Sequence, residues 1–145
     1  MRSFIILACV IVCAKAIDQA LIDELKTQVQ EYGIECAESE KATPEDVEAL
    51  MNHKAPPTHA GRCVVFCVSK KMNLMNEDGT VAVPKSEWLD KVKADDPEAY
   101  EKMQNLYTIC KERVEAKSDG CDSAMELVSC VKYEGEKSGL DKYLA

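Results

Sequence analysis

Apolar residues recur along this chain at steps of three and four, with charged residues between them, which is the period of an amphipathic helix. The first such stretch covers residues 17–32 and ends at Gly33, where we expect the helix to be interrupted before a short second piece. Its predicted inward face carries Leu21, Leu25, Val29 and Tyr32.

Capping residues, prolines and turn residues divide the rest of the chain into five more predicted helices. They run from Thr43 to before Pro56, from Thr58 to about Met75, from Pro84 to about Ala94, from Asp96 to about Val114, and from Cys121 to about Tyr133. No alternating strand pattern is longer than residues 80–83. The pattern therefore predicts an all-α fold of about six helices joined by short loops.

Gly135 precedes, and Gly139 lies within, an amphiphilic tail at residues 138–145 that contains Leu140, Tyr143 and Leu144. Chain ends are often frayed, so one interpretation of this tail is disorder.

The chain has 145 residues, enough for one domain plus a leader. Arg2, an apolar run over residues 4–12 and the small residues around Lys15 have the features of a secretory signal peptide at residues 1–16. The mature domain is then residues 17–145, with 16 basic against 26 acidic residues. This acidic balance argues against binding to nucleic acid or to anionic membranes, and no later segment is apolar enough to span a bilayer.

Removal of the leader reduces the eight cysteines to six, which are Cys36, Cys63, Cys67, Cys110, Cys121 and Cys130. An even number of cysteines in a secreted chain predicts a disulfide framework. Cys63 and Cys67 lie one helical turn apart on the same face, so they are expected to reach different partners. Six cysteines still allow 15 pairings. Zinc is the alternative for this spacing, but the leader favours oxidised pairs, and we expect no metal and no cofactor.

Catalytic motifs are missing from the sequence: it has no Gly-x-Ser-x-Gly elbow, no glycine-rich phosphate loop and no His-Glu-x-x-His. A small secreted lipid hydrolase would need a His–Asp pair and a calcium loop, and residues 76–79 lack the register of one. The two histidines, His53 and His59, flank a pair of prolines and are interpreted as solvated loop residues, with a pH switch as the alternative. We therefore predict a protein that is not an enzyme.

The cysteine spacing C-x26-C-x3-C-x42-C-x10-C-x8-C resembles that of the six-cysteine insect odorant-binding proteins, the PBP/GOBP family. The resemblance covers the whole mature chain, and it implies the alternative to disorder for residues 138–145, a lid segment over the cavity. It implies three interlocked disulfides, Cys36–Cys67, Cys63–Cys121 and Cys110–Cys130, and helices around a central apolar cavity. It also implies a secreted carrier that binds small hydrophobic odorants or pheromones and takes them through sensillar lymph to olfactory receptors, as a monomer or a weak homodimer.

The apolar stripes name candidate cavity residues, although core packing alone would explain such stripes. With the resemblance, the candidate ligand-binding residues are Phe66, Leu74, Trp88, Leu89, Met103, Leu106, Tyr107, Met125, Val128, Val131 and Tyr143. The hydroxyl of Tyr107 or Tyr133 is expected to hydrogen-bond a ligand oxygen. The same fold in saliva, venom or reproductive tissue, carrying other small molecules, is the alternative to olfaction.

Overall fold

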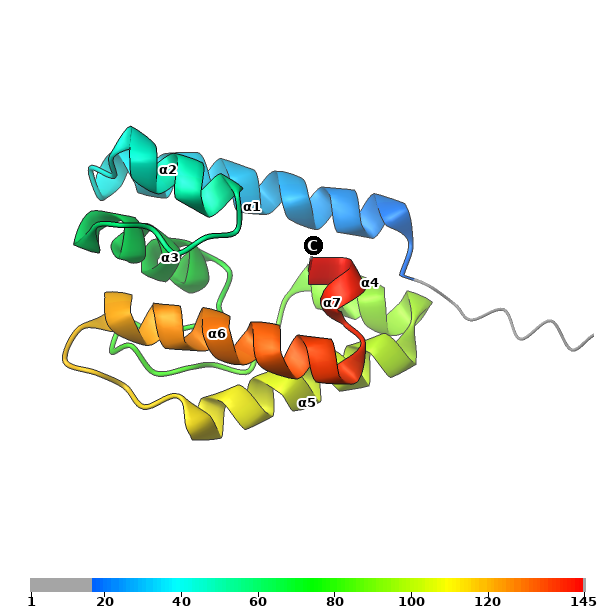
Figure 1. Cartoon of the computed structure of the whole chain (residues 1–145). Coiled ribbons are helices and arrows are strands. Elements are labelled where there is room, and N and C mark those ends of the chain that lie inside the picture. Colours follow the sequence, from blue (N-terminus) through cyan, green and yellow to red (C-terminus); the bar gives the residue numbers. More distant parts are fainter. Residues whose placement is uncertain (1–16, 145) are drawn as a thin grey trace, which may run out of the picture.

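The computed structural model describes residues 17–144 and contains helices with one isolated β-bridge, between Met75 and Val81 (Figure 1). Within this range seven helices follow one another: α1 (Gln19–Ser39), α2 (Pro44–Met51), α3 (His59–Lys71), α4 (Glu87–Asp95), α5 (Pro97–Arg113), α6 (Gly120–Ser138) and α7 (Asp141–Leu144). The predicted all-α class is confirmed, and the additional helix, α7, comes from the tail. The predicted leader and its cleavage site lie outside the described residues.

The helices begin where the sequence supplies capping side chains. The side chain before each of the six longer helices accepts a hydrogen bond from a backbone N–H of the first turn, and these residues are Asp18, Thr43, Thr58, Ser86, Asp96 and Asp119. Pro44 and Pro97 occupy first-turn positions, where the missing N–H has no consequence. Local sequence thus decides where each helix starts.

The predicted interruption at Gly33 is wrong, because α1 continues through this residue to Ser39. A glycine inside a helix costs only about 1 kcal/mol relative to alanine. The second half of α1 is held by Cys36, which is fully buried and disulfide-bonded to α3. Tertiary attachment therefore outweighs the local preference.

Two other expectations about helix ends and faces need correction. Helix α6 does not stop near Tyr133 but continues past Gly135 to Ser138, and ends where Gly139 adopts a left-handed conformation with φ of 73°. On α2 the apolar spacing of Val47, Leu50 and Met51 predicts three inward side chains, but that of Met51 is 76% exposed. The short α2 packs mainly on α3, so only one side of it is covered.

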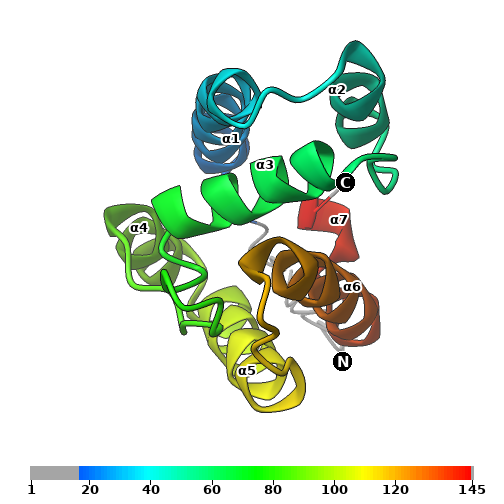
Figure 2. The ribbon, with the colours of Figure 1, turned by 90° about the vertical axis from the view of Figure 1, so that its left-hand side faces the viewer.

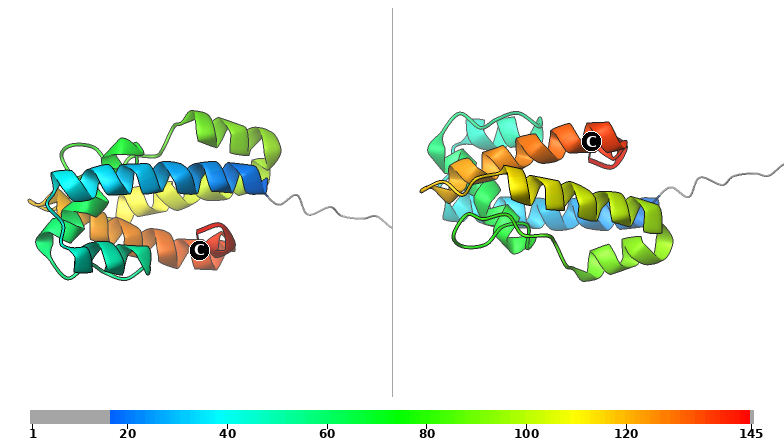
Figure 3. Two further views of the ribbon diagram at one scale, coloured as in Figure 1. Left: turned by 90° about the horizontal axis from the view of Figure 1, so that it is seen from above. Right: turned by 90° about the horizontal axis from the view of Figure 1, so that it is seen from below.

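Three long helices, α1, α5 and α6, run along the length of the molecule, and α3 lies across them (Figures 2 and 3). Helix α3 packs against both α1 and α6, while α5 packs against α4 and α6. The end-on view shows α1, α3, α4, α5 and α6 around a common interior. The apolar faces of these helices meet there.

Three disulfides join these helices, in the pairing that the family resemblance implies. Cys36–Cys67 ties α1 to α3, Cys63–Cys121 ties α3 to α6, and Cys110–Cys130 ties α5 to α6. The expectation that the two cysteines of α3 reach different partners is confirmed. Four of the helices are thereby connected into one covalent network through α3 and α6.

A buried carboxylate, Asp46, fixes the junction between α2 and α3. It accepts hydrogen bonds from the backbone N–H and hydroxyl of Thr43, at 3.0 and 3.1 Å, and from those of Thr58, at 3.0 and 2.6 Å. Burial works to raise the pKa of Asp46, but the hydrogen bonds from Thr58 and Thr43 outweigh it and lower the pKa to about 2.

We expect this carboxylate to make the protein sensitive to strong acid. Because the folded-state pKa lies below the ordinary value of 3.8, the stabilisation is present above that pH and is lost as the pH falls toward about 2. The difference in unfolding free energy between the wild type and Asp46→Asn should be large at neutral pH and should shrink in this acidic window. Chemical denaturation at several pH values measures it.

The control for this experiment is Glu45→Gln, which changes an exposed carboxylate in the same first turn. It should change stability little at any pH. A difference between wild type and Asp46→Asn that stays constant down to about pH 2 would contradict the assignment.

Candidate functional site

The interior between the helices is a continuous apolar cluster. It includes buried side chains from α4, α5 and α6, the buried Val81 of the loop after α3, and Ile17 ahead of α1. Ten further apolar or aromatic side chains pack against it but remain partly accessible; these are Leu21, Ile22, Val65, Phe66, Leu74, Trp88, Tyr100, Tyr107, Val131 and Tyr143. A side chain that packs on the core and still keeps accessible surface is suited to contact a guest molecule.

Nine of the predicted ligand-site residues belong to this interior. Three of them are buried core residues, with exposed fractions of 5, 8 and 4%: Leu89, Met103 and Leu106. Six are partly buried and pack against the core: Phe66, Leu74, Trp88, Tyr107, Val131 and Tyr143. The structure therefore brings together side chains from five helices and from the loop after α3. Their contact with a ligand stays a prediction.

The other two predicted residues, Met125 and Val128, do not lie in this cluster. Val128 is 45% exposed, so its predicted inward orientation is wrong. Met125 lines an open cleft on the outer face of α5 and α6, about 580 Å³ in volume, together with Arg113, Lys117 and Tyr133. Helix α6 packs against α3, α5 and α7, so its apolar residues point in several directions, and the spacing alone does not tell which face the interior.

Tyr133, one of the two candidate hydroxyl donors, is 54% exposed in the same outer cleft. Its ring lies between the guanidinium of Arg113 and the ammonium of Lys137, at 5.9 and 5.2 Å from the ring centroid. Its hydroxyl is therefore not placed to meet a molecule in the interior.

The polar N–H of the Trp88 indole has a hydrogen-bond partner within the protein. Its Nε1–H donates a hydrogen bond of 2.7 Å to the backbone carbonyl of Leu21, which joins α4 to α1. The indole N–H of Trp88 is therefore not free to bind a ligand. Its ring remains available as apolar surface, and it positions the two helices that bound one side of the interior.

Phe66 has protein neighbours on two sides of its ring. The tip of the ring lies against the backbone of Gly120, so closely that a Cβ at that position would overlap it. The ammonium of Lys70 lies 4.7 Å from the ring centroid. Phe66 therefore serves first to seat the start of α6 on α3, which requires glycine at position 120.

Tyr107, on α5, has the most unusual environment of the predicted residues. Burial raises the pKa of its hydroxyl to about 12. The side chain is only partly buried, and no hydrogen bond joins its hydroxyl to any described residue. Since no fully buried polar atom among the described residues lacks a partner, this hydroxyl keeps some access to solvent at the edge of the apolar interior. An unpartnered hydroxyl in such a place is a suitable anchor for a polar atom of a ligand.

The C-terminal segment is ordered against the other helices. Gly139 N–H donates to the carbonyl of Glu136, and Leu140 N–H donates to the carbonyl of Gly135 at 2.8 Å, the arrangement that closes a helix and turns the chain. Leu140 is 2% exposed within the core cluster, and Tyr143 packs on that cluster from α7. The tail thus contributes to the wall of the interior.

Several side chains that pack on the core cluster are absent from the predicted ligand-site residues. The helical period of the apolar residues could have identified Leu21 and Tyr100. Ile22 and Val65 lie at the edges of their apolar stripes, so the period does not single them out. Met75 and Val81 are buried and are joined by the isolated β-bridge. No periodic pattern of apolar residues predicts this bridge. Of the described helices, none has the length and apolar composition needed to cross a membrane.

Comparisons with known proteins agree with this geometry. The model of the PBP/GOBP family matches residues 18–134. General odorant-binding protein 19d of Drosophila melanogaster is 33% identical over 112 residues, which cover 77% of this chain and 74% of that protein.

Solved structures share the fold. An odorant-binding protein from Drosophila melanogaster, dmelOBP28a, superposes with a TM-score of 0.65 at 23% identity and covers 82% of this chain and 98% of its own. The fatty acid binding protein OBP56a from the oral disk of the blowfly Phormia regina has a TM-score of 0.59 at 24% identity, covering 79% and 95%. A pheromone binding protein of the cockroach Leucophaea maderae, in complex with the reporter ANS, has a TM-score of 0.52 at 22% identity, covering 80% and 96%.

Proposed function

The chain belongs to the PBP/GOBP family, and on that premise we propose that it carries small hydrophobic odorants or pheromones through an extracellular aqueous fluid to olfactory receptors. The ligand would be enclosed between α1, α4, α5 and α6. Burial of apolar ligand surface supplies the binding free energy, at roughly 25 cal/mol per Å² before the losses on association. For a small volatile molecule this corresponds to a dissociation constant on the order of micromolar.

The observation that supports this proposal most is the combination of an apolar cluster with one partly buried, unpartnered hydroxyl, that of Tyr107. A hydroxyl in such a place favours a ligand with a single oxygen, such as an alcohol, aldehyde, ketone or ester. Among the described residues, the buried polar and charged side chains are those of Asp46, Ser69, Asp96, Ser123 and Glu134, and none is a cation. A ligand carboxylate enclosed among these fully buried side chains would lack a positive partner, which is unfavourable. The ammonium groups beside Phe66 and Tyr143 belong to Lys70, which is partly exposed, and Lys142, which is exposed.

The test is competitive displacement of a fluorescent apolar probe by a straight-chain alcohol, and by the alkane and the carboxylate of equal chain length. We expect the alcohol to bind best. The variant Tyr107→Phe should weaken alcohol binding by about 3- to 10-fold, which is one net hydrogen bond, and leave alkane binding unchanged. Tyr133→Phe, which removes the exposed hydroxyl of the outer cleft, is the matched control.

The two parts of the proposal fail in different ways. If no volatile compound displaces the probe at neutral pH, the carrier function is wrong. If alcohols bind but Tyr107→Phe binds them as well as the wild type does, only the anchoring role is wrong. Tight binding of the carboxylate would contradict the preference for neutral ligands.

A second candidate is carriage of a small hydrophobic molecule outside olfaction. The blowfly neighbour in this fold is described as a fatty acid binding protein of the oral disk, which is a precedent for this architecture in another tissue. The pattern of tissue expression distinguishes the two, since both use the same interior.

A further inference from the structure

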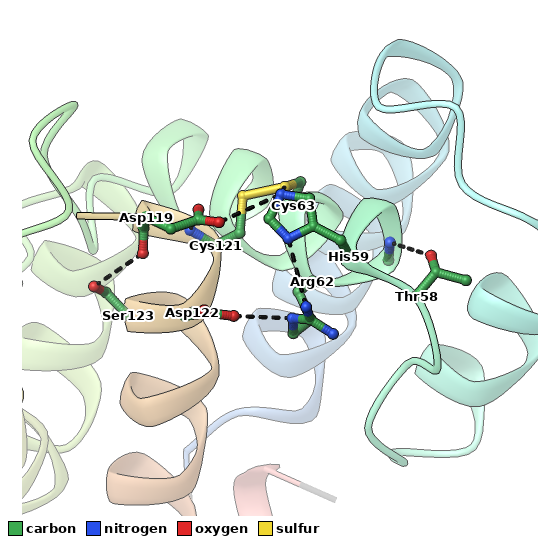
Figure 4. The surroundings of a disulfide bond; sticks show 9 residues. Thr58, His59, Arg62, Cys63, Asp119, Cys121, Asp122 and Ser123 are labelled. Carbon is green, nitrogen blue, oxygen red and sulfur yellow. Dashed lines mark hydrogen bonds and ion pairs between the residues drawn. A yellow bond between two sulfur atoms is a disulfide. The ribbon is translucent and has the colours of Figure 1, made fainter. Parts of the chain in front are cut away.

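One disulfide, Cys63–Cys121, has polar and charged side chains around it (Figure 4). It joins the second turn of α3 to the first turn of α6. His59 lies one turn before Cys63 on α3, and its Nε2 is 3.4 Å from the Cys63 sulfur. Asp119, the N-cap of α6, places Oδ2 at 3.3 Å from the same nitrogen. The side chains of His59 and Asp119 are 57% and 38% exposed.

We propose that this disulfide is the first of the three to be reduced by a dithiol, and that the reduced pair forms a zinc site completed by His59 and Asp119. One ligand atom from each of the four residues lies within 4.8 Å of the others. Two thiolates, an imidazole and a carboxylate are a donor set that zinc prefers, in tetrahedral geometry. The proposal does not depend on the carrier function.

The separations between donor atoms already approach those of a tetrahedral zinc site. Zinc–sulfur bonds of about 2.3 Å and zinc–nitrogen or zinc–oxygen bonds of about 2.0 Å require about 3.6 Å between sulfur and nitrogen and about 3.3 Å between nitrogen and oxygen. The corresponding distances from His59 Nε2 are 3.4 Å to Cys63 Sγ and 3.3 Å to Asp119 Oδ2. The two sulfurs, bonded here, must separate to about 3.8 Å, and the remaining donor pairs, all within 4.8 Å, must adjust toward about 3.3–3.6 Å.

Neighbouring groups orient the donors. Asp119 Oδ1 accepts the backbone N–H of Cys121 at 2.9 Å, which fixes the carboxylate and leaves Oδ2 directed at His59. Two thiolates and one carboxylate around Zn²⁺ give one net negative charge. The guanidinium of Arg62 lies beside the site, with Nη2 3.5 Å from His59 Nδ1, and is itself paired with Asp122 through Nε at 2.9 Å.

The reduction step balances with a dithiol as the two-electron donor. A thiolate of the dithiol attacks Cys63 Sγ, and the electron pair of the S–S bond leaves on Cys121 Sγ. The second thiol of the dithiol loses its proton to solvent and attacks the dithiol sulfur in the mixed disulfide with Cys63. Cys63 leaves as a thiolate, and the dithiol becomes an intramolecular disulfide. Cys121 lies in the first turn of α6, where the helix dipole stabilises the departing thiolate.

The other two disulfides have less accessible surroundings. Each contains one fully buried cysteine, Cys36 or Cys110, whereas Cys63 is partly exposed and Cys121 is 7% exposed. The second members, Cys67 and Cys130, are as accessible as these two. Zinc would also replace the lost covalent link, because α3 and α6 would remain joined through the metal. The junction between these two helices would then persist in both redox states.

The first measurement is partial reduction of the folded protein with limiting dithiothreitol, followed by alkylation and mass spectrometry. We expect Cys63 and Cys121 to be labelled before the other four cysteines. Labelling of another pair first, or of all six together, would overturn the proposal.

The second measurement is titration of the partly reduced protein with Co²⁺ and then Zn²⁺. One Co²⁺ per chain should bind, with the visible absorption of tetrahedral thiolate-ligated cobalt, and Zn²⁺ should displace it; the oxidised protein should show neither. His59→Ala and Asp119→Asn should each weaken binding by more than the roughly 10- to 100-fold that an outer-shell change produces. Asp119→Asn keeps a good N-cap, so the helix start is preserved.

The matched control is Asp122→Asn, which lies beside the site and contacts Arg62 without supplying a donor atom. The metal affinity of this variant should fall by no more than the roughly 10- to 100-fold expected for an outer-shell change. The proposal is wrong if the reduced wild type binds no stoichiometric metal, or if His59→Ala and Asp119→Asn bind it as tightly as the wild type.

Discussion

Replacement of both Cys63 and Cys121 by alanine is expected to lower the free energy of unfolding by about 4 kcal/mol, the largest loss for any single disulfide here. The bond closes the longest loop, with a sequence separation of 58, against 31 for Cys36–Cys67 and 20 for Cys110–Cys130. In the chain-entropy description, a longer loop restricts the unfolded chain more, so its removal releases more conformational freedom.

The comparison variant replaces Cys110 and Cys130 by alanine, with an expected loss of about 3 kcal/mol. Guanidinium denaturation of both variants and the wild type, in the absence of reductant, measures the difference. A smaller loss from the longer loop than from the shorter one would show that local packing, rather than unfolded-state entropy, determines the stabilisation.

Leu140→Ala is expected to destabilise the protein by about 3 kcal/mol and to accelerate dissociation of a bound apolar probe. Leu140 is 2% exposed and is the buried residue that follows the left-handed Gly139 at the end of α6. Its truncation leaves a cavity in the core and removes the attachment of α7, together with the contact that Tyr143 makes with the cluster. The interior then loses part of its wall.

Denaturation curves and stopped-flow release of the probe test the two effects. Lys142→Ala, in the same segment but exposed, is the control and should alter neither. A stability loss below about 1 kcal/mol would show that the segment is not docked in solution. The expected loss of about 3 kcal/mol, together with an unchanged rate of probe dissociation, would show that α7 does not cover the ligand.

The helix starts and the secreted disulfide class followed from local sequence. Caps such as Thr43 and Asp119 act on the N–H groups of the next turn, so their effect is visible within a few residues. The interruption expected at Gly33 was wrong because a contact with a distant part of the chain, rather than the local sequence, decides whether α1 continues. The disulfide at Cys36 joins α1 to a helix 31 residues away, and no local pattern contains that contact.

The candidate site shows the same division. The stripe on α5 was predicted correctly for Met103, Leu106 and Tyr107, because one side of α5 packs on its neighbours. On α6 the prediction was wrong for Val128, since this helix is contacted from several directions. Trp88 and Tyr107 have similar apolar-plus-polar character in sequence, yet one polar atom is bound to a backbone carbonyl and the other has no described partner.

The sequence by itself determined the helices, their capped starts, the six cysteines of the mature chain and the apolar residues available for an interior. These features depend on period, local hydrogen bonding and residue chemistry, all of which act over short separations. Only the tertiary structure decided which apolar faces form the wall, which hydroxyl stays unpartnered, and that His59 and Asp119 meet at the Cys63–Cys121 bond. Those facts depend on contacts between distant segments, whose packing and cross-links no single stretch of sequence specifies.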